Sequence, residues 1–385
     1  MKIKVGVFFG GRSVEHEVSI VSAMQAVAAL DKTKYQAIPV YMTKDGRFFT
    51  GEGFDRVENY RDGKALLEGG AQVALIRDND SVILLRHPAR KLRASVLDRL
   101  DVALPVAHGS NGEDGTLSGL FESLGLPYAG CDVFSSAACM NKSACKTLLS
   151  AADIPVLPHK IFTGREISGD PSVCRQIEDA FGYPVAVKPN NLGSSIGIGI
   201  ARDRAALQSA LELAARFSER VLAEPAIEDL TEINCAVLGN AYQALPSVCE
   251  RPVGSDEILS YQDKYLNNGG GKGMAQAKRQ IPADIPDALA QEIQKMAVKA
   301  FQTLGCGGVA RIDFMLDKDK IYLNEINNIP GSLAFYLFEP AGIPFPKLLD
   351  QLIDLAFQRQ RDNAALHFTF ENNLLANVHL GGMKK

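Results

Sequence analysis

The sequence lacks the short patterns that would assign it at once to several common protein classes. No apolar run is long enough to span a bilayer, and the phosphate-loop pattern GxxxxGK[ST] occurs nowhere. The stretch HEVSI has Ile20 where an HExxH zinc motif needs its second histidine. The stretch FFGGRSVEHEVS lacks the GxGxxG spacing of dinucleotide-binding folds. These absences argue against a membrane-spanning protein, a P-loop enzyme, an HExxH zinc enzyme and an NAD-dependent oxidoreductase.

Cysteine is present, but not in the arrangements that bind zinc or build disulfide scaffolds. The seven cysteines are scattered, odd in number and include no CxxC pair. This usage predicts reduced thiols in a cytoplasmic protein. The formal charge of −4 gives no electrostatic reason to bind nucleic acid or an anionic membrane. The start, MKIKVGVFFGGRSVEHE, shows no small-residue cleavage site, so we expect a buried first strand there.

The length and composition predict an ordinary soluble globular protein. The chain has 385 residues, of which 46% are hydrophobic and 22% charged, and this length suggests two or three domains. KIKVGVFF and YQAIPVYM have the nearly continuous apolar character of buried parallel strands, with a helix, SIVSAMQAVAAL, between them. LDVALPVAHG predicts a later strand of the same sheet. Residues 44–100 are weakly periodic and their elements cannot be ordered.

Regular elements are predicted along the rest of the chain. We expect one helix through SSAACMNKSACKTLLSAA, a strand in YPVAVKP and a helix in ALQSALELAARF. EINCAVLGNAYQALPSV predicts a hairpin with a two-residue turn at Gly239-Asn240. Further helices are predicted in LSGLFESLG, which Gly125 would end, in DALAQEIQKMAVKAFQTLG and in FPKLLDQLIDLAFQR.

The hairpin RIDFMLDKDKIYLNEIN, residues 311–327, carries polar side chains in a pattern that is otherwise apolar. Because opposite residues of an antiparallel pair point to the same face, we expect Asp313 opposite Glu325 and Arg311 opposite Asn327. The remaining expected placements are Met315 opposite Leu323 on that polar face, and Ile312, Phe314, Tyr322 and Ile326 on the buried face.

Two interpretations of this polar face are open. Two opposite carboxylates repel each other unless a cation compensates them, and ligands that are all oxygen atoms suit magnesium. The alternative is an ion pair between Arg311 and Asp313, with Glu325 solvated.

Other candidate binding residues lie near glycines. In VAVKPNNLGSSIGIGI, Lys188 ends a buried strand and precedes a turn with Ser194 and Ser195, where backbone amides could approach phosphate oxygens. A flexible hairpin with a surface lysine would give the same pattern, and Lys142 would be an exposed helix lysine. Likewise, Glu15 suits the first turn of a helix, and His108 ends a strand, where it could be purely structural.

The combination of these stretches resembles one known family. FFGGRSVEHEVS, HGSNGEDGTLSGLFESLGLPYAG, MNKSACK, VAVKPNNLGSSIG and RIDFMLDKDKIYLNEINNIPGS, in this order, resemble the D-alanine–D-alanine ligase family. YQDKYL, residues 261–266, is similar to its active-site loop. The resemblance implies an α/β fold with α+β character in its ATP-grasp part. It implies a Rossmann-like N-terminal substrate-binding domain (1–130), a central ATP-grasp subdomain (131–222) and a C-terminal subdomain with the metal site (223–385).

The resemblance also implies roles for residues at matching positions. The ATP-binding residues would be Lys142, Lys188, Ser195, Glu224, Glu232 and Lys264. The metal ligands would be Asp313, Glu325 and Asn327. The catalytic groups would be Glu15, Ser194, Tyr265, Arg311 and the Gly331 amide. The amino acid substrates would contact Glu15, His108, Arg311, Tyr336 and Leu337. Tyr336 departs from the family, which usually has a serine contact to the second substrate's carboxylate there.

The implied activity is ATP-dependent joining of two D-alanine molecules for peptidoglycan synthesis, with Mg²⁺ (two ions, or Mn²⁺ in their place). The segment YQDKYLNNGGGKGMAQAK would close over the site. The implied protein is a cytoplasmic homodimer. Because of Tyr336, a ligase with D-lactate, D-serine or another acceptor is an alternative, as is a nucleotide-binding regulator without catalysis.

Overall fold

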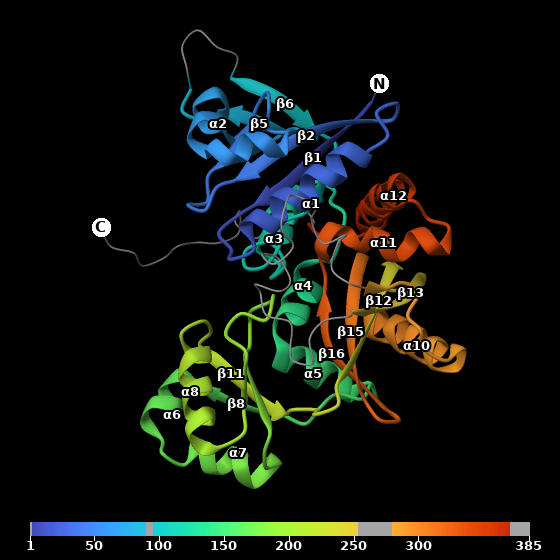
Figure 1. Ribbon diagram of the computed structural model, residues 1–385. Helices are drawn as coiled ribbons and strands as arrows, with labels where there is room; N and C mark the ends of the chain where they lie inside the picture. The colour runs from blue at the N-terminus through green and yellow to red at the C-terminus, as the bar shows by residue number, and fades with distance from the viewer. Residues whose placement is uncertain (1, 90–94, 253–278, 370–385) are drawn as a thin grey trace, which may run out of the picture.

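The computed structural model describes residues 2–89, 95–252 and 279–369, and within these ranges the strands form three sheets. Figure 1 shows the N-terminal sheet in blue to cyan, the second sheet with its helices in green and yellow, and the third in yellow to orange beside the C-terminal helices. The sheets hold seven, four and five strands.

The first sheet has the order β6-β5-β4-β3-β2-β1-β7. Its elements are β1 (Ile3–Gly10), α1 (His16–Ala29), β2 (Tyr35–Met42), β3 (Phe48–Thr50), η1 (Val57–Asp62), α2 (Gly63–Gly69), β4 (Ala71–Asp78), β5 (Ser81–Arg86), β6 (Val96–Leu100), β7 (Val102–Pro105) and α3 (Thr116–Leu124). Strand β1 is parallel to β2 and β7, as predicted. The region that could not be ordered contains η1, α2 and the antiparallel strands β3 to β6. Gly125 ends α3 with a φ of 61°, also as predicted.

The second sheet is antiparallel, with the order β10-β9-β11-β8. Its elements are β8 (Lys160–Thr163), α6 (Gly164–Gly169), α7 (Val173–Phe181), β9 (Val185–Pro189), β10 (Gly199–Ala201), α8 (Arg204–Ala215) and β11 (Arg220–Pro225). The apolar sides of its helices and strands share one buried core, from Phe162 to Ala223. Lys188 therefore belongs to a strand, β9, whose residues are all buried.

The third sheet has the order β14-β13-β12-β15-β16. Its elements are β12 (Thr231–Gly239), β13 (Ala244–Pro252), β14 (Arg279–Gln280), α10 (Asp287–Thr303), β15 (Gly308–Asp317) and β16 (Lys320–Asn327). The predicted two-residue turn at Gly239-Asn240 is wrong. Gly239 still pairs with Ala244, and the Asn240 amide donates to the Gln243 carbonyl, so residues 240–243 form the turn.

The single helix predicted through residues 135–152 is also wrong, because Asn141 divides it. Helix α4 (Val133–Met140) ends there and α5 (Lys142–Ala151) begins. Asn141 has an extended backbone, and its side chain accepts a hydrogen bond from the Ala144 amide as an N-cap. The break places Lys142 in the first turn of α5.

The N-terminal and C-terminal parts of the chain share a hydrophobic core. The last elements are η3 (Gly331–Ala334), α11 (Phe335–Phe338), η4 (Glu339–Ala341) and α12 (Phe345–Ala364). Leu333, Phe338 and Leu348 from this region pack in one cluster with Val5 and Phe9 of β1. In the described ranges, no helix combines the length and apolarity needed to cross a membrane. The domain boundaries at 130 and 222 stay a prediction.

Candidate active site

A row of polar residues crosses the third sheet from β13 to β16. Glu250 pairs with Asn234, Asn234 pairs with Asp313, and Asp313 pairs with Glu325. Directly paired residues point to the same face of a sheet, so these four side chains share one face. The predicted pairing of Asp313 with Glu325, and of Arg311 with Asn327, is confirmed.

Beyond Asp313 the predicted register is wrong, because β16 contains a bulge. Phe314 pairs with Leu323, and Met315 pairs with Tyr322, which leaves Asn324 as the extra residue. Leu323 is consequently fully buried in the core, where Tyr322 was expected. The bulge lets two consecutive residues, Asn324 and the glutamate after it, serve the polar face.

Both carboxylates on the polar face of the hairpin are paired with cations. Asp313 accepts two hydrogen bonds of 2.7 Å from the Arg311 guanidinium and one of 2.9 Å from the Asn327 amide. Glu325 Oε2 lies 3.1 Å from Lys142 Nζ. The predicted alternative is therefore right about the Arg311–Asp313 ion pair, but Glu325 pairs with Lys142 instead of being solvated.

Lys188 belongs to a buried charged group that the sequence did not reveal in full. Its Nζ lies 2.6 Å from Glu224 Oε1 and donates to Asn324 Oδ1 at 3.0 Å. The other oxygen of Glu224 lies 2.8 Å from Lys146 Nζ. Burial raises the pKa of Glu224, but the two lysines outweigh it and lower this pKa to about 2. Lys146 and Asn324 were not predicted, and the only sequence signal is a second lysine in MNKSACK.

Lys142 is buried, in contrast to the exposed helix lysine that its sequence position suggested. Besides its ion pair, its Nζ donates a 2.8 Å hydrogen bond to the Leu192 carbonyl, and its backbone amide donates to Asn190 at 3.0 Å. These contacts fasten the glycine-rich turn to α5. In that turn Ser194 and Ser195 both adopt left-handed φ values, 56° and 57°.

Glu15 connects this turn to the N-terminal sheet. Its carboxylate is buried and accepts a hydrogen bond from the Ser194 hydroxyl. A side chain in place of Gly109 would approach the Glu15 carboxylate to 2.6 Å, so glycine leaves room for it. Glu113 is close by, and burial together with the charge of Glu15 raises the pKa of Glu113. Glu113 was not predicted as a site residue.

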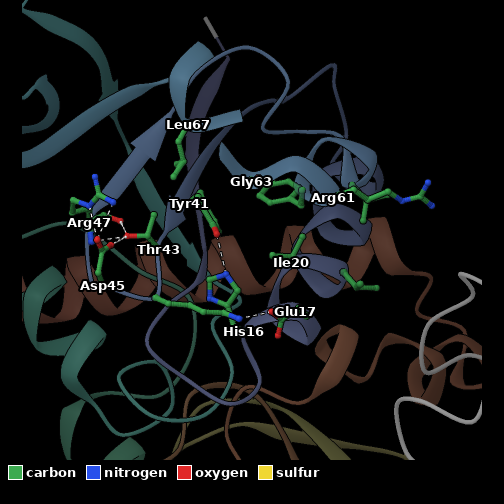
Figure 2. Close-up of a pocket in the computed structure, with 14 residues that line it drawn as sticks. His16, Glu17, Ile20, Tyr41, Thr43, Asp45, Arg47, Arg61, Gly63 and Leu67 are labelled. Atoms are coloured by element: carbon green, nitrogen blue, oxygen red, sulfur yellow. Dashed lines mark hydrogen bonds and ion pairs between the residues drawn. The ribbon is translucent and has the colours of Figure 1, made fainter. Parts of the chain in front are cut away.

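The neighbouring His16 holds the loop that carries Glu15. Its Nδ1 lies 2.7 Å from the Gly11 carbonyl and its Nε2 lies 2.9 Å from the Tyr41 hydroxyl, in a groove of about 570 Å³ (Figure 2). Nδ1 must donate to the carbonyl, so Nε2 accepts from the tyrosine. Burial lowers the pKa of His16 and keeps this neutral form.

His108 links the first sheet to the loop after β16. Its Nδ1 donates to the Ile329 carbonyl at 2.8 Å, and its Nε2 lies 2.9 Å from the Ser22 hydroxyl. The same hydroxyl accepts from the Ser332 amide at 3.1 Å. These bonds position the Gly331 backbone relative to α1. A direct contact of His108 with substrate stays a prediction.

A left-handed turn follows Gly331. Ser332, Leu333 and Ala334 have φ values of 51–53°, which cost L-residues about 1–2 kcal/mol each. All three residues are buried, Leu333 and Ala334 in the shared core, and this packing holds the strain. The turn delivers Tyr336 to the polar face of the sheet.

The structure says less about the remaining predicted residues. Glu232 lies two residues before Asn234 on β12, and hence on the same face. Leu337 is fully buried in the core. Lys264, Tyr265 and the predicted closing segment lie outside the described residues.

The donor set fits a hard divalent cation. Asp313, Glu325 and Asn327 offer oxygen atoms on one face of the hairpin, as Mg²⁺ prefers. Among the described residues, no three His, Cys, Asp or Glu side chains converge into a protein-only metal cluster. This pattern agrees with an ion that also uses substrate oxygens.

Comparison with known proteins agrees with this geometry. The fold and the site define an ATP-grasp ligase, which is the class of its structural neighbours. The family described as D-ala D-ala ligase N-terminus matches residues 4–131, and the one described as D-ala D-ala ligase C-terminus matches residues 148–354. The chain therefore belongs to the D-alanine–D-alanine ligase family.

Individual relatives cover nearly the whole chain. A D-alanine–D-alanine ligase of Acetivibrio thermocellus is 41% identical over 376 residues, which are 94% of this chain and 98% of the relative. The solved D-alanine-D-alanine ligase of Coxiella burnetii has a TM-score of 0.79 at 30% identity, covering 94% of this chain and 96% of its own. The VanG D-Ala:D-Ser ligase of Enterococcus faecalis has a TM-score of 0.77 at 30% identity, covering 92% and 100%.

Proposed function

We propose that this protein joins two D-alanine molecules at the expense of ATP, with ADP and phosphate as the other products. Relatives with that activity in their name align over nearly the whole chain. The main observation behind the proposal is that two lysines come together beside the paired carboxylates of the hairpin at one site. Lys142 and Lys188 reach the bulge of β16 beside the Asp313–Glu325 pair.

In the first half-reaction, a carboxylate oxygen of the first D-alanine attacks the γ-phosphorus of ATP. The bond to the β,γ-bridging oxygen breaks and ADP leaves. Phosphoryl transfer needs cations on the oxygens and in-line positioning. Lys142 and Lys188 are the cations for this purpose, and Glu15 would hold the amino group of the same D-alanine.

Metal ions complete the charge balance. Asp313, Glu325 and Asn327 would hold Mg²⁺, which supplies positive charge to phosphate oxygens. Two ions, or Mn²⁺ in their place, belong to this proposal.

In the second half-reaction, the amine of the second D-alanine attacks the carbonyl carbon of the acyl phosphate. The carbon–oxygen bond to phosphate breaks, phosphate leaves and the amine loses a proton. Negative charge builds on the carbonyl oxygen, where Arg311 and the Gly331 amide would stabilise it. Ser194 and Tyr265 belong to this proposal as catalytic groups, and Ser195 and Lys264 as ATP-binding groups.

The cellular setting is part of the same proposal. D-Ala-D-Ala is a peptidoglycan precursor, so we infer a cytoplasmic enzyme of cell-wall synthesis that works as a homodimer. Nucleic acid and membrane are not expected partners, in keeping with the net charge of −4.

The decisive experiment uses purified protein with ATP, MgCl₂ and D-alanine. We expect ADP release that depends on D-alanine, and dipeptide detectable by mass spectrometry, with L-alanine as the inactive control. ADP release that needs added D-serine or D-lactate would establish an altered acceptor instead. If no amino acid pair stimulates ATP turnover, the ligase proposal fails.

A further inference from the structure

Glu250, at the β13 end of the polar row, is a buried carboxylate that none of the roles above uses. It is 1% exposed. Asn234 Nδ2 donates to its Oε1 at 3.1 Å, and Arg279 Nη1 donates to its Oε2 at 3.3 Å. The Tyr336 hydroxyl lies 3.4 Å from Oε1. A buried charge persists only with such partners, so this group is built around Glu250.

Arg279 is the member of this group that can meet a ligand. Its guanidinium carbon lies 4.6 Å from the centre of the Tyr336 ring, which fixes the plane of the guanidinium. The Arg279 side chain is 15% exposed, against 2% for Glu250. Arg279 Nη1 donates to Glu250, and a guanidinium has five N–H donors, so others can serve a ligand. The Glu250 carboxylate therefore lies deeper than the Arg279 guanidinium, so the cation is the group that an anionic ligand would meet.

The position of the group points to one anion. Glu250 and Asp313 both pair with Asn234, so the cluster adjoins Arg311 and Asp313 on the same face. Tyr336 follows the turn that begins at Gly331. Resting on the proposed function, we propose that Arg279 binds the carboxylate of the acceptor D-alanine, and that Tyr336 and Glu250 are positioning residues for the Arg279 guanidinium.

The chemistry of the three side chains supports this division of roles. A guanidinium edge binds a carboxylate through two parallel hydrogen bonds. Burial and the charge of Glu250 raise the pKa of Tyr336, so its hydroxyl keeps its proton and donates it to Glu250. Glu250 is enclosed by three donors and is not placed to accept the proton of the attacking amine.

The test separates the two amino acid sites by their chemistry. D-alaninamide has a neutral amide in place of the carboxylate, so it can act only as an acceptor. Positional isotope exchange in ¹⁸O-labelled ATP with D-alanine reports the first half-reaction. In Arg279→Gln we expect the acceptor KM for D-alanine to rise about 100-fold, as for the loss of a bidentate charged contact. We expect unchanged isotope exchange and unchanged use of D-alaninamide.

Matched variants distinguish binding from folding. Arg251→Gln removes an exposed arginine from β13, which carries Glu250 and pairs with the Arg279 strand β14, and should behave as wild type. Tyr336→Phe keeps the ring under Arg279 but removes the hydrogen bond to Glu250, so it should raise the acceptor KM about tenfold and leave the use of D-alaninamide unchanged. Glu250→Gln should raise the same KM and leave D-alaninamide unaffected, which a purely structural role would not do.

Failure of this inference differs from failure of the proposed function. Wild-type protein that forms no dipeptide overturns the proposed function. Wild-type protein that forms dipeptide, with an unchanged acceptor KM in Arg279→Gln or equal losses for D-alanine and D-alaninamide, overturns the acceptor site alone.

Discussion

Lys142 and Glu325 form an ion pair of 3.1 Å between the start of α5 and the bulge of β16. Lys188 reaches the preceding residue of the same bulge, Asn324, at 3.0 Å. Two lysines from different parts of the chain thus meet one irregularity in a strand. Because of the bulge, two consecutive residues, Asn324 and Glu325, can contact both lysines.

Glu325→Gln tests the importance of charge at this point. Glutamine keeps an acceptor for Lys142 but removes the negative charge that a metal ion needs. We expect the rate of ADP formation to fall about 10²–10³-fold, by analogy with the loss of one electrostatic group in an active site. The melting temperature should change little, because glutamine keeps an acceptor for the buried Lys142, which also donates to the Leu192 carbonyl. Near-normal turnover would contradict the metal assignment, and Glu339→Gln, at an exposed position, is the control.

Lys146→Met should lower stability. Lys146 and Glu224 are both 1% exposed, and removing the lysine leaves the buried carboxylate with Lys188 as its remaining cation. Breaking a buried pair costs about 3–5 kcal/mol, and we expect the lower end here because Lys188 remains. Urea unfolding measures this change. Lys64→Met, at an 88% exposed side chain, should leave the free energy of unfolding unchanged; an equal effect of both substitutions would refute the prediction.

His108 should make stability depend on pH. Burial lowers its pKa to about 4, against 6.5 when exposed. Between these values the unfolded chain binds a proton that the folded chain does not, so stability falls as the pH drops from 6.5 towards 4. At pH 5 the loss relative to pH 7 amounts to about 2 kcal/mol. In His108→Gln this part of the pH dependence should be missing from urea unfolding curves, and an identical slope in both proteins would show that His108 does not titrate this way.

The thiols should be unreactive in the folded protein. All seven cysteines are free and buried. Burial raises the pKa of most of them, for example that of Cys145 to about 12, so little thiolate forms at neutral pH. Ellman's reagent should modify almost none of them within minutes, and all seven after denaturation in guanidinium. Rapid modification of several thiols without denaturant would show that the core opens readily.

Local patterns in the sequence predicted much of the fold. The parallel pairing of β1 with β2 follows from continuous apolar runs, and the end of α3 follows from Gly125. The hairpin register at Asp313 and Glu325 follows from keeping the polar residues on one face. Each of these features depends on neighbours within a short stretch or on a strict period.

The features that were missed depend on distant partners. The bulge at Asn324 and the burial of Lys142 make sense only once β9 and α5 lie beside β16. The break at Asn141 similarly reflects contacts with Asn190. Residues 44–100 resisted ordering because short antiparallel strands at a sheet edge carry weak periodicity.

The run of left-handed residues from Ser332 to Ala334 has a consequence for sequence change elsewhere. Its conformation survives because helix α1 holds it through hydrogen bonds from Ser332 to Ser22 and Gln25. Mutations in α1 that loosen this grip would let the loop relax to an ordinary right-handed shape and carry the Gly331 amide out of place. Substitutions that accumulate in α1 would then slow turnover in a protein that is otherwise well folded.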